Sequence, residues 1–201
     1  MKVRSKATAV TAAVVGGALV VGAGAFALSN VLVSNESEKI TVSEPSSVAE
    51  ESRDSAAAEV QSQSIDQMLV YLAEEEKLAH DVYAVLGDMW GDQIFTNIQR
   101  SEVSHQDQVS SLLTTYGISD PRSSEVGVFT NTELQALYDQ LIAQGSQSVT
   151  EAYKVGVLIE ETDIADLQES IAATSDPVIL TTLNRLLGAS ENHLKAFSRK
   201  I

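Results

Sequence analysis

Residues 94–116, IFTNIQRSEVSHQDQVSSLLTTY, carry the pattern that decides the fold. Apolar residues recur there at alternating steps of three and four, which is the stripe that an amphipathic helix buries in a bundle. The stripe consists of Phe95, Ile98, Glu102, His105, Val109, Leu112 and Tyr116. It is apolar at both ends and carries an acid and an imidazole in its middle. This pattern predicts a helix that places Glu102 and His105 inside a bundle core.

Three further segments repeat this arrangement. Residues 65–90, 148–173 and 177–201 each show a helical stripe that is apolar except near its midpoint. The polar residues are Glu76 on the first stripe, Glu160 and Asp163 on the second, and His193 on the third. If the helices pack with their midpoints level, one core layer contains Glu76, Glu102, His105, Glu160, Asp163 and His193.

The connections between these segments indicate how the helices are paired. Gly91 ends the first helix and only a few residues precede the second, so these two helices are expected to be antiparallel neighbours. A longer passage, residues 118–147, holds Pro121, Gly127 and a shorter helix at residues 132–144. A short turn joins the last two helices. The sequence therefore predicts an all-α fold: a four-helix bundle of ferritin-like connectivity, with one long crossover containing a short extra helix.

The start of the chain has a different composition. Lys2, Arg4 and Lys6 precede an uncharged apolar run to about Val33, which is the layout of an export signal and is also long enough for a membrane anchor. Residues 34–64 are rich in Ser, Glu and Ala, show no apolar stripe, and are predicted to be a disordered acidic linker. We therefore expect an exported protein, secreted or anchored by residues 1–33, with its folded domain at residues 65–201.

Charge and cysteine content exclude several classes of function. The chain carries 13 Lys and Arg against 28 Asp and Glu, a net charge of −15, which disfavours nucleic acid and anionic membrane surfaces as partners. Membrane contact is expected only through the N-terminal segment. There is no Cys, so disulfides, thiol nucleophiles and sulfur-ligated metals are excluded. Any bound metal must be held by oxygen and imidazole ligands.

Charge balance in the predicted core layer favours two metal ions. Burying four carboxylates without partners would cost roughly several kcal/mol each, against a net domain stability of about 5–15 kcal/mol. No Lys or Arg lies on the four stripes. Two divalent cations would balance the four carboxylates, and two neutral imidazoles would complete the ligand set. A lone Glu-x-x-His is common by chance and a lone core His is usually just hydrogen-bonded, so the hypothesis depends on the whole set.

Three segments carry a family resemblance. They are EEEKLAHDVY at residues 74–83, IEETDI at residues 159–164 and NHLKAF at residues 192–197. They resemble the bacterial and archaeal family called domain of unknown function 2202, within the ferritin-like superfamily. The resemblance covers residues 65–197 and implies a ferritin-like bundle with a diiron centre. The superfamily pattern of Glu, Glu-x-x-His, Glu and Glu-x-x-His falls on Glu76, Glu102 with His105, Glu160, and His193.

The last of these motifs is incomplete, because Ser190 stands where the pattern has a Glu. Asp163, one turn from Glu160 on the same helix face, is the expected replacement carboxylate. Glu161 and Glu75 are alternatives that a slight helix rotation would allow. Glu191 is a further alternative, although it is displaced by about 100° around the helix from the position of the missing Glu. His80 is a candidate for an outer position.

Tyr83 and Tyr153 each lie seven residues from a proposed Glu ligand. Their hydroxyls need partners if they are buried. They are interpreted either as ordinary core side chains or as an electron relay.

Two functions fit this pattern. The first is an oxidoreductase whose two metal ions, iron or alternatively manganese, react with dioxygen or peroxide, as in a ferroxidase or a peroxidase. The second is a non-catalytic surface protein that sequesters metal ions. A third, purely structural reading is a helical module with a vestigial site. The sequence leaves the substrate, the electron donor and the oligomeric state open.

Overall fold

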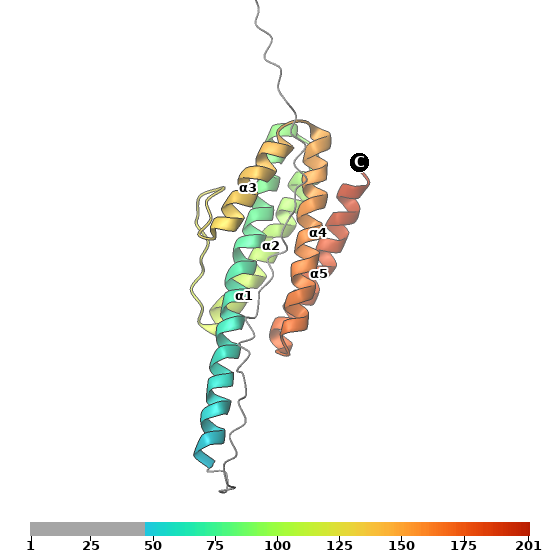
Figure 1. Cartoon of the computed structure of the whole chain (residues 1–201). Coiled ribbons are helices and arrows are strands. Elements are labelled where there is room, and N and C mark those ends of the chain that lie inside the picture. Colours follow the sequence, from blue (N-terminus) through green and yellow to red (C-terminus); the bar gives the residue numbers. More distant parts are fainter. Residues whose placement is uncertain (1–46) are drawn as a thin grey trace, which may run out of the picture.

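The computed structural model describes residues 47–201, with side chains from Ile65 onward. These residues form five helices and no strand (Figure 1). The helices are α1 (Ser47–Trp90), α2 (Gln93–Tyr116), α3 (Thr132–Gly145), α4 (Val149–Ala173) and α5 (Pro177–Ser198). The prediction of an all-α bundle, with a short helix in the crossover between the two helix pairs, is confirmed.

Side-chain caps set the start of each helix from α2 onward. Asp92, Asn131, Ser148 and Asp176 each accept a hydrogen bond from a backbone N–H in the first turn of the helix that follows. Gly117 ends α2 with a φ of 69°, in the left-handed region that glycine adopts without strain. Local sequence therefore determines where these helices begin and where α2 ends.

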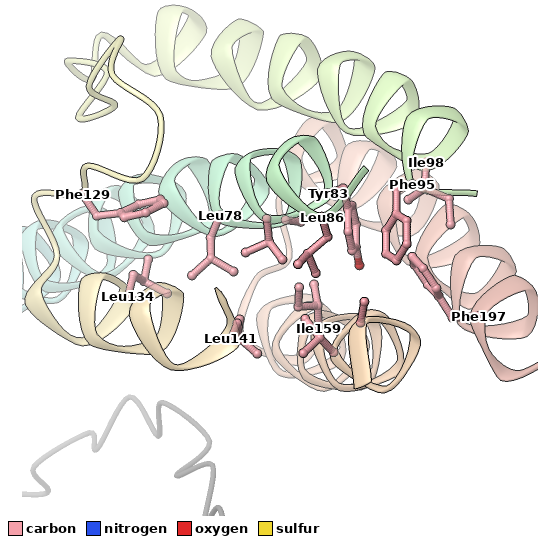
Figure 2. Close-up of a cluster of buried hydrophobic side chains, with 14 residues drawn as sticks. Leu78, Tyr83, Leu86, Phe95, Ile98, Phe129, Leu134, Leu141, Ile159 and Phe197 are labelled. Carbon is pink, nitrogen blue, oxygen red and sulfur yellow. The ribbon is translucent and has the colours of Figure 1, made fainter. Parts of the chain in front are cut away.

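The four long helices close a bundle around two apolar clusters. Helix α1 packs along α2, α4 packs along α5, and the pairs meet through α1 with α4 and α2 with α5, while α3 covers α1 and α4 (Figure 1). One cluster surrounds Tyr83, Phe95 and Phe197 (Figure 2), and the other surrounds Leu69 and Leu183. On each long helix the polar stripe residues lie between the residues of these clusters. The polar layer is thus enclosed by apolar packing on both sides.

Helix α1 begins earlier than predicted. We expected its start near Ile65, whereas the helix begins at Ser47 and extends past the other helices in Figure 1. Residues 47–64 therefore belong to a helix and not to an irregular linker. Ala, Glu and Gln are frequent in this stretch and favour helix, and extending an existing helix costs less than nucleating a new one.

The predicted signal or anchor, residues 1–33, lies outside the described residues, as do residues 34–46 of the predicted linker. Among the helices of residues 47–201, none has both the length and the apolar character needed to span a bilayer.

Glu74 attaches the crossover to α1. This carboxylate is 1 % exposed and accepts hydrogen bonds from the backbone N–H groups of Thr130, at 2.6 Å, and Asn131, at 2.9 Å. The two amides lie at the start of α3. A negative charge there also interacts favourably with the N-terminal end of the helix. The buried charge of Glu74 is thus used for fixing α3 to the bundle.

Asp81 and Lys77 attach the segment that precedes α3. Asp81 accepts a hydrogen bond from the backbone N–H of Gly127, at 2.9 Å, and pairs with Lys77 one turn earlier. Lys77 also donates to the backbone carbonyl of Glu125, at 2.9 Å. Some charged residues of the EEEKLAHDVY segment therefore attach the crossover to α1, whereas Glu76 faces the polar layer of the core.

Close packing of α4 on α5 gives a prediction about Gly156. A Cβ atom at this position would lie 2.5 Å from Cδ1 and 2.6 Å from Cε1 of the Phe197 ring. Because Phe197 is fully buried, we expect Gly156→Ala to lower the free energy of unfolding by about 1–3 kcal/mol in denaturant titrations. Gly188→Ala on α5, where the added Cβ would meet nothing within 4 Å beyond its chain neighbours and the backbone of its own helix, is the control and should be neutral or stabilising by up to about 1 kcal/mol. Equal stability of the two variants would contradict the packing.

Candidate metal centre

The first group of candidate ligands joins α1 and α2. His105 Nδ1 lies 2.8 Å from Glu102 Oε2 and 3.2 Å from Glu76 Oε2. One potential ligand atom from each of the three residues lies within 4.8 Å of the others. All three side chains are buried, with 2–3 % exposure. Glu102 and His105 are three residues apart on α2, so the helix itself places them on one face.

The second group joins α2, α4 and α5. His193 Nδ1 lies 3.0 Å from Glu102 Oε1 and 3.5 Å from Glu160 Oε2. These three residues also offer ligand atoms within 4.8 Å of one another. Five of the six residues predicted from the stripes therefore meet in two adjoining groups.

Glu102 belongs to both groups. Its Oε2 faces His105 and its Oε1 faces His193, and the two imidazole rings are stacked at a centroid distance of 5.5 Å and an angle of 22°. A carboxylate that turns one oxygen to each of two ligand groups is placed as a bridge would be. The two groups together can therefore accommodate two cations that share one ligand.

Asp163, the sixth predicted residue, lies beside these groups and is a member of neither. Its Oδ2 accepts a hydrogen bond from the hydroxyl of Ser190, and its Oδ1 has no hydrogen-bond partner among the described residues. Ser190 also donates to the backbone carbonyl of Leu186, at 3.1 Å. The serine that replaces the expected Glu on α5 thus holds a carboxylate that α4 provides. Whether Asp163 binds metal stays a prediction.

The carboxylates proposed as alternatives to Asp163 differ in burial. Glu161 and Glu191 are exposed and lie outside the bundle core, so they do not replace the missing Glu. Glu75 is 7 % exposed, and its Oε2 has no partner among the side chains of residues 65–201. His80 bonds to Asp81, at 2.9 Å, and is absent from both ligand groups. Of these alternatives, Glu75 alone is buried beside the candidate site.

The carboxylates of the first group have opposite pKa shifts. Burial raises the pKa of Glu76 to about 7, despite the nearby imidazole of His105. Burial also acts to raise the pKa of Glu102, but the imidazoles of His105 and His193 outweigh it and lower the value to about 2. Glu102 is therefore the permanent anion of the cluster.

Both imidazoles hold protons strongly in the metal-free protein. Burial acts to lower the pKa of His105, but the carboxylates of Glu102 and Glu76 raise it to about 11. The carboxylates of Glu102 and Glu160 likewise outweigh burial and raise the pKa of His193 to about 9. Without metal, protons therefore provide the positive charge that balances the buried carboxylates.

Several buried oxygen and nitrogen atoms that could bind a metal ion form no hydrogen bond, and their chemistry shows whether a metal ion fits this layer. Within the described part of the chain, the atoms that form no hydrogen bond are Glu75 Oε2, Glu76 Oε1, Glu102 Oε1, Asp163 Oδ1 and His193 Nδ1. Of these, Glu102 Oε1 and His193 Nδ1 face each other at 3.0 Å as an ion pair without hydrogen-bond geometry. Leaving such atoms buried without bonds costs about 1–3 kcal/mol each. All are oxygen or imidazole donors of the kind that iron, manganese and zinc accept. The donor set therefore fits divalent cations.

A small cavity reaches this layer between α1, α3 and α4. Its volume is about 20 Å³, which is room for about one water-sized molecule. The polar part of its lining consists of Glu75, Glu76, Glu102, Glu160, Thr162 and Asp163. Leu134, Leu137 and Leu141 of α3 form much of its apolar wall. Only a molecule of very few atoms can occupy this space beside the carboxylates.

Substituting Asp163 tests its predicted role. Asp163→Asn keeps the side-chain size and the contact with Ser190 but removes one of four negative charges next to two dications. We expect the affinity for one of the two metal ions to fall by about tenfold or more in Mn²⁺ titrations. Glu161→Gln, an exposed position on the same helix, is the control. Equal affinities of the two variants would remove Asp163 from the ligand set and direct attention to Glu75.

The fold and this buried layer define a helical-bundle protein with a candidate dimetal site of carboxylates and imidazoles. The chain belongs to the family described as "Uncharacterized protein domain (DUF2202)", whose profile matches residues 65–201. The family resemblance seen in the sequence is thus confirmed.

Two comparisons identify a relative of this family. The chain is 43 % identical over 134 residues to the uncharacterized protein MJ0754 of Methanocaldococcus jannaschii, covering 66 % of this chain and 72 % of that protein. The structure is similar to the crystal structure of the hypothetical protein MJ0754 from Methanococcus jannaschii, with a TM-score of 0.67 and 36 % identity. That superposition covers 83 % of this chain and 85 % of the other. The same overall fold thus occurs in a solved structure.

Proposed function

We propose that this protein is a ferritin-like dimetal oxidoreductase that binds two iron ions and reacts with dioxygen or peroxide. The observation that carries the proposal is the position of Glu102 between two ligand groups, one containing Glu76 and His105 and the other Glu160 and His193. A histidine that is buried only for packing needs one hydrogen-bond partner, and this does not account for two groups of carboxylates and imidazole that share Glu102.

The proposed ligand set balances the charge of two dications. The first ion would be held by Glu76, Glu102 and His105, and the second by Glu102, Glu160 and His193. Asp163 supplies the fourth negative charge from beside both. Manganese is the alternative metal, because oxygen and imidazole donors suit it as well.

The chain's own residues supply position and shielding. Iron held there would provide the electrons that reduce dioxygen or peroxide. The hydroxyl of Tyr83 donates to Glu160 Oε1, at 2.6 Å, and restrains the orientation of that carboxylate. The apolar clusters on both sides exclude bulk water, and the cavity beside Glu76 and Asp163 has room for about one water-sized molecule. These features favour a small oxidant as the reacting molecule.

The location of the protein is part of the proposal. The positively charged start and apolar run of residues 1–33 support export from the cytoplasm, with the domain either released or held at the membrane by this segment.

Anaerobic titration of Fe²⁺ tests the proposal. We expect the metal-free protein to bind about two Fe²⁺ ions, and His105→Ala and His193→Ala each to bind about one fewer, since each imidazole serves a different position. Adding peroxide to the loaded protein should then produce a ferric absorbance change in stopped-flow measurements. Tight binding without any such reaction would favour metal sequestration instead. Absence of bound metal would overturn both functions.

A further inference from the structure

Tyr83 connects the candidate centre to an aromatic group. Its side chain is fully buried in the apolar cluster of Figure 2, and its hydroxyl donates to Glu160 Oε1, at 2.6 Å. The other oxygen of Glu160 lies 3.5 Å from His193 Nδ1. The phenol is therefore in direct contact with a proposed metal ligand.

Tyr153 forms a second pair of the same kind at the end of the bundle. Its hydroxyl donates to Asp92 Oδ2, at 2.6 Å, and the same oxygen accepts from Lys200 Nζ, at 2.8 Å. Asp92 caps the start of α2, and Lys200 follows the end of α5. Tyr153 is only partly buried. This phenol–carboxylate pair is thus accessible from the surface.

Phe95 and Phe197 lie between these two pairs. The Phe95 ring is stacked on Tyr153, at a centroid distance of 5.8 Å and an angle of 13°, and its centroid lies 6.4 Å from that of Tyr83. The Phe197 ring lies 5.2 Å from Tyr83 and 5.6 Å from Phe95. Figure 2 shows Tyr83, Phe95 and Phe197 side by side. Aromatic contacts are therefore continuous from Tyr83, which bonds to the proposed ligand Glu160, to Tyr153 at the surface.

We propose that Tyr83 and Tyr153 form an electron-transfer route between the candidate centre and the end of the bundle at Asp92 and Lys200. The two hydroxyl groups each donate to a carboxylate at 2.6 Å, so each phenol can lose its proton to that carboxylate when it loses an electron. Phe95 and Phe197 fill the space between the two phenol rings with aromatic contacts. The inference rests on the proposed function in one respect: the oxidant forms at the carboxylate–histidine cluster.

Tyr83 loses one electron to a one-electron oxidant at the cluster, and its hydroxyl proton passes to Glu160. Tyr153 then transfers an electron to the Tyr83 radical, which recovers its proton from Glu160, while the proton of Tyr153 passes to Asp92. An external one-electron reductant finally reduces the Tyr153 radical, and Asp92 returns the proton. One electron has moved from the reductant to the cluster, and every proton is back in place.

This route identifies the class of electron donor. The cavity at the cluster has room for about one water-sized molecule, so a reductant of more than a few atoms cannot enter it. Such a donor can instead act at the partly buried ring of Tyr153. The donor is therefore a one-electron reductant that works from the surface, whereas peroxide or dioxygen works inside.

Photo-oxidation of the metal-free protein tests the route without any metal. Ruthenium tris-bipyridine with persulfate oxidises tyrosines from outside and is too large to enter the bundle. In wild-type protein we expect electron paramagnetic resonance of frozen samples to show a long-lived tyrosyl radical from buried Tyr83. The signal should disappear in Tyr83→Phe, and also in Tyr153→Phe, because the proposed relay to the surface is then removed. Tyr138→Phe is the control, since that half-buried ring packs on Phe129 elsewhere, and should retain the signal.

Two results would overturn the route. One is a Tyr83 radical of wild-type intensity in Tyr153→Phe, and the other is a long-lived signal that Tyr83→Phe leaves unchanged. Because Asn caps a helix about as well as Asp, Asp92→Asn keeps the start of α2 and removes the charged proton acceptor, together with its ion pair to the exposed Lys200. It should lower the radical yield in a protein whose melting curve is that of the wild type, and a wild-type yield would count against the route.

The iron-loaded protein gives an independent result. After addition of peroxide, Tyr153→Phe should prolong the life of the Tyr83 radical, because its route to the external reductant is cut. A protein that binds no iron would overturn the proposed function, while the photo-oxidation result would still decide whether the two phenols exchange electrons.

Discussion

Glu102→Gln is expected to weaken both candidate metal positions at once, by about 100-fold or more at each. The reason is that Glu102 alone belongs to both ligand groups, with Oε2 facing His105 and Oε1 facing His193. The substitution keeps the size of the side chain but removes the charge, and it turns one of the two oxygens into a hydrogen-bond donor that cannot bind a cation. Elemental analysis after desalting, together with Mn²⁺ titration, measures the loss.

The controls for this variant come from the same bundle. Glu161→Gln makes the same chemical change at an exposed position of α4 and should retain both ions. His105→Ala should retain one, because the group formed by Glu102, Glu160 and His193 stays complete. If Glu102→Gln keeps two ions, Glu102 is not a shared ligand and the dimetal arrangement is wrong.

Residue spacing along the helices predicted most of this layer. A helix repeats every 3.6 residues or so, so residues on one stripe face the core together, and the polar members of four stripes mark a common height. Glu76, Glu102, His105, Glu160 and His193 meet for this reason. The short turn at Gly91 likewise sufficed to predict that α1 and α2 are neighbours.

Other features depend on contacts between helices, which periodicity does not contain. In the sequence Ser190 marks only the missing Glu of a motif, yet in the structure its hydroxyl holds Asp163 from the neighbouring helix. Glu74 and Asp81 look like further acids of a charged segment, but each binds backbone amides of the crossover more than forty residues away. A sequence shows that a carboxylate is present, and only the packed structure shows whether it faces a metal site or a loop.

The start of α1 was missed for a different reason. The search for an amphipathic stripe detects helices that bury a face, and residues 47–64 have no such stripe. Intrinsic helix propensity and propagation from the packed part of α1 extend the helix there without any stripe. A composition rich in Ala, Glu and Gln next to a strong helix was the signal available.

Metal affinity is expected to rise with pH, by about tenfold per pH unit for each proton that a metal ion displaces. In the metal-free protein the pKa of His105 is about 11 and that of His193 about 9, so both imidazoles are protonated between pH 6 and 8. Each must lose its proton before it can bind a cation. Below about pH 7 a proton on Glu76 must leave as well, and burial also raises the pKa of Asp163 well above its ordinary value, so this carboxyl adds to the protons displaced if it binds metal.

The metal-free protein should show the opposite trend. A histidine whose pKa is raised on folding stabilises the fold below its ordinary pKa, and this contribution is lost as pH rises through about 9 for His193 and about 11 for His105. Glu76, whose pKa is raised to about 7, also binds its proton more tightly when folded. The free energy of unfolding should therefore fall as pH increases from about 5 to 10, and added metal should reverse the fall.

Titration of Mn²⁺ at pH 6, 7 and 8 measures the slope without redox chemistry, and calorimetry in buffers of different ionisation enthalpy counts the protons released. Ordinary histidines, with pKa values near about 6.5, would give an affinity that is almost constant above pH 7. His80→Gln, outside both ligand groups, should leave the slope unchanged, whereas His193→Gln should remove the contribution of one proton at one position. A flat affinity from pH 7 to 8 would mean that the imidazoles do not hold the protons that balance the buried carboxylates, and a different pair of groups must then neutralise Glu102 and Glu160.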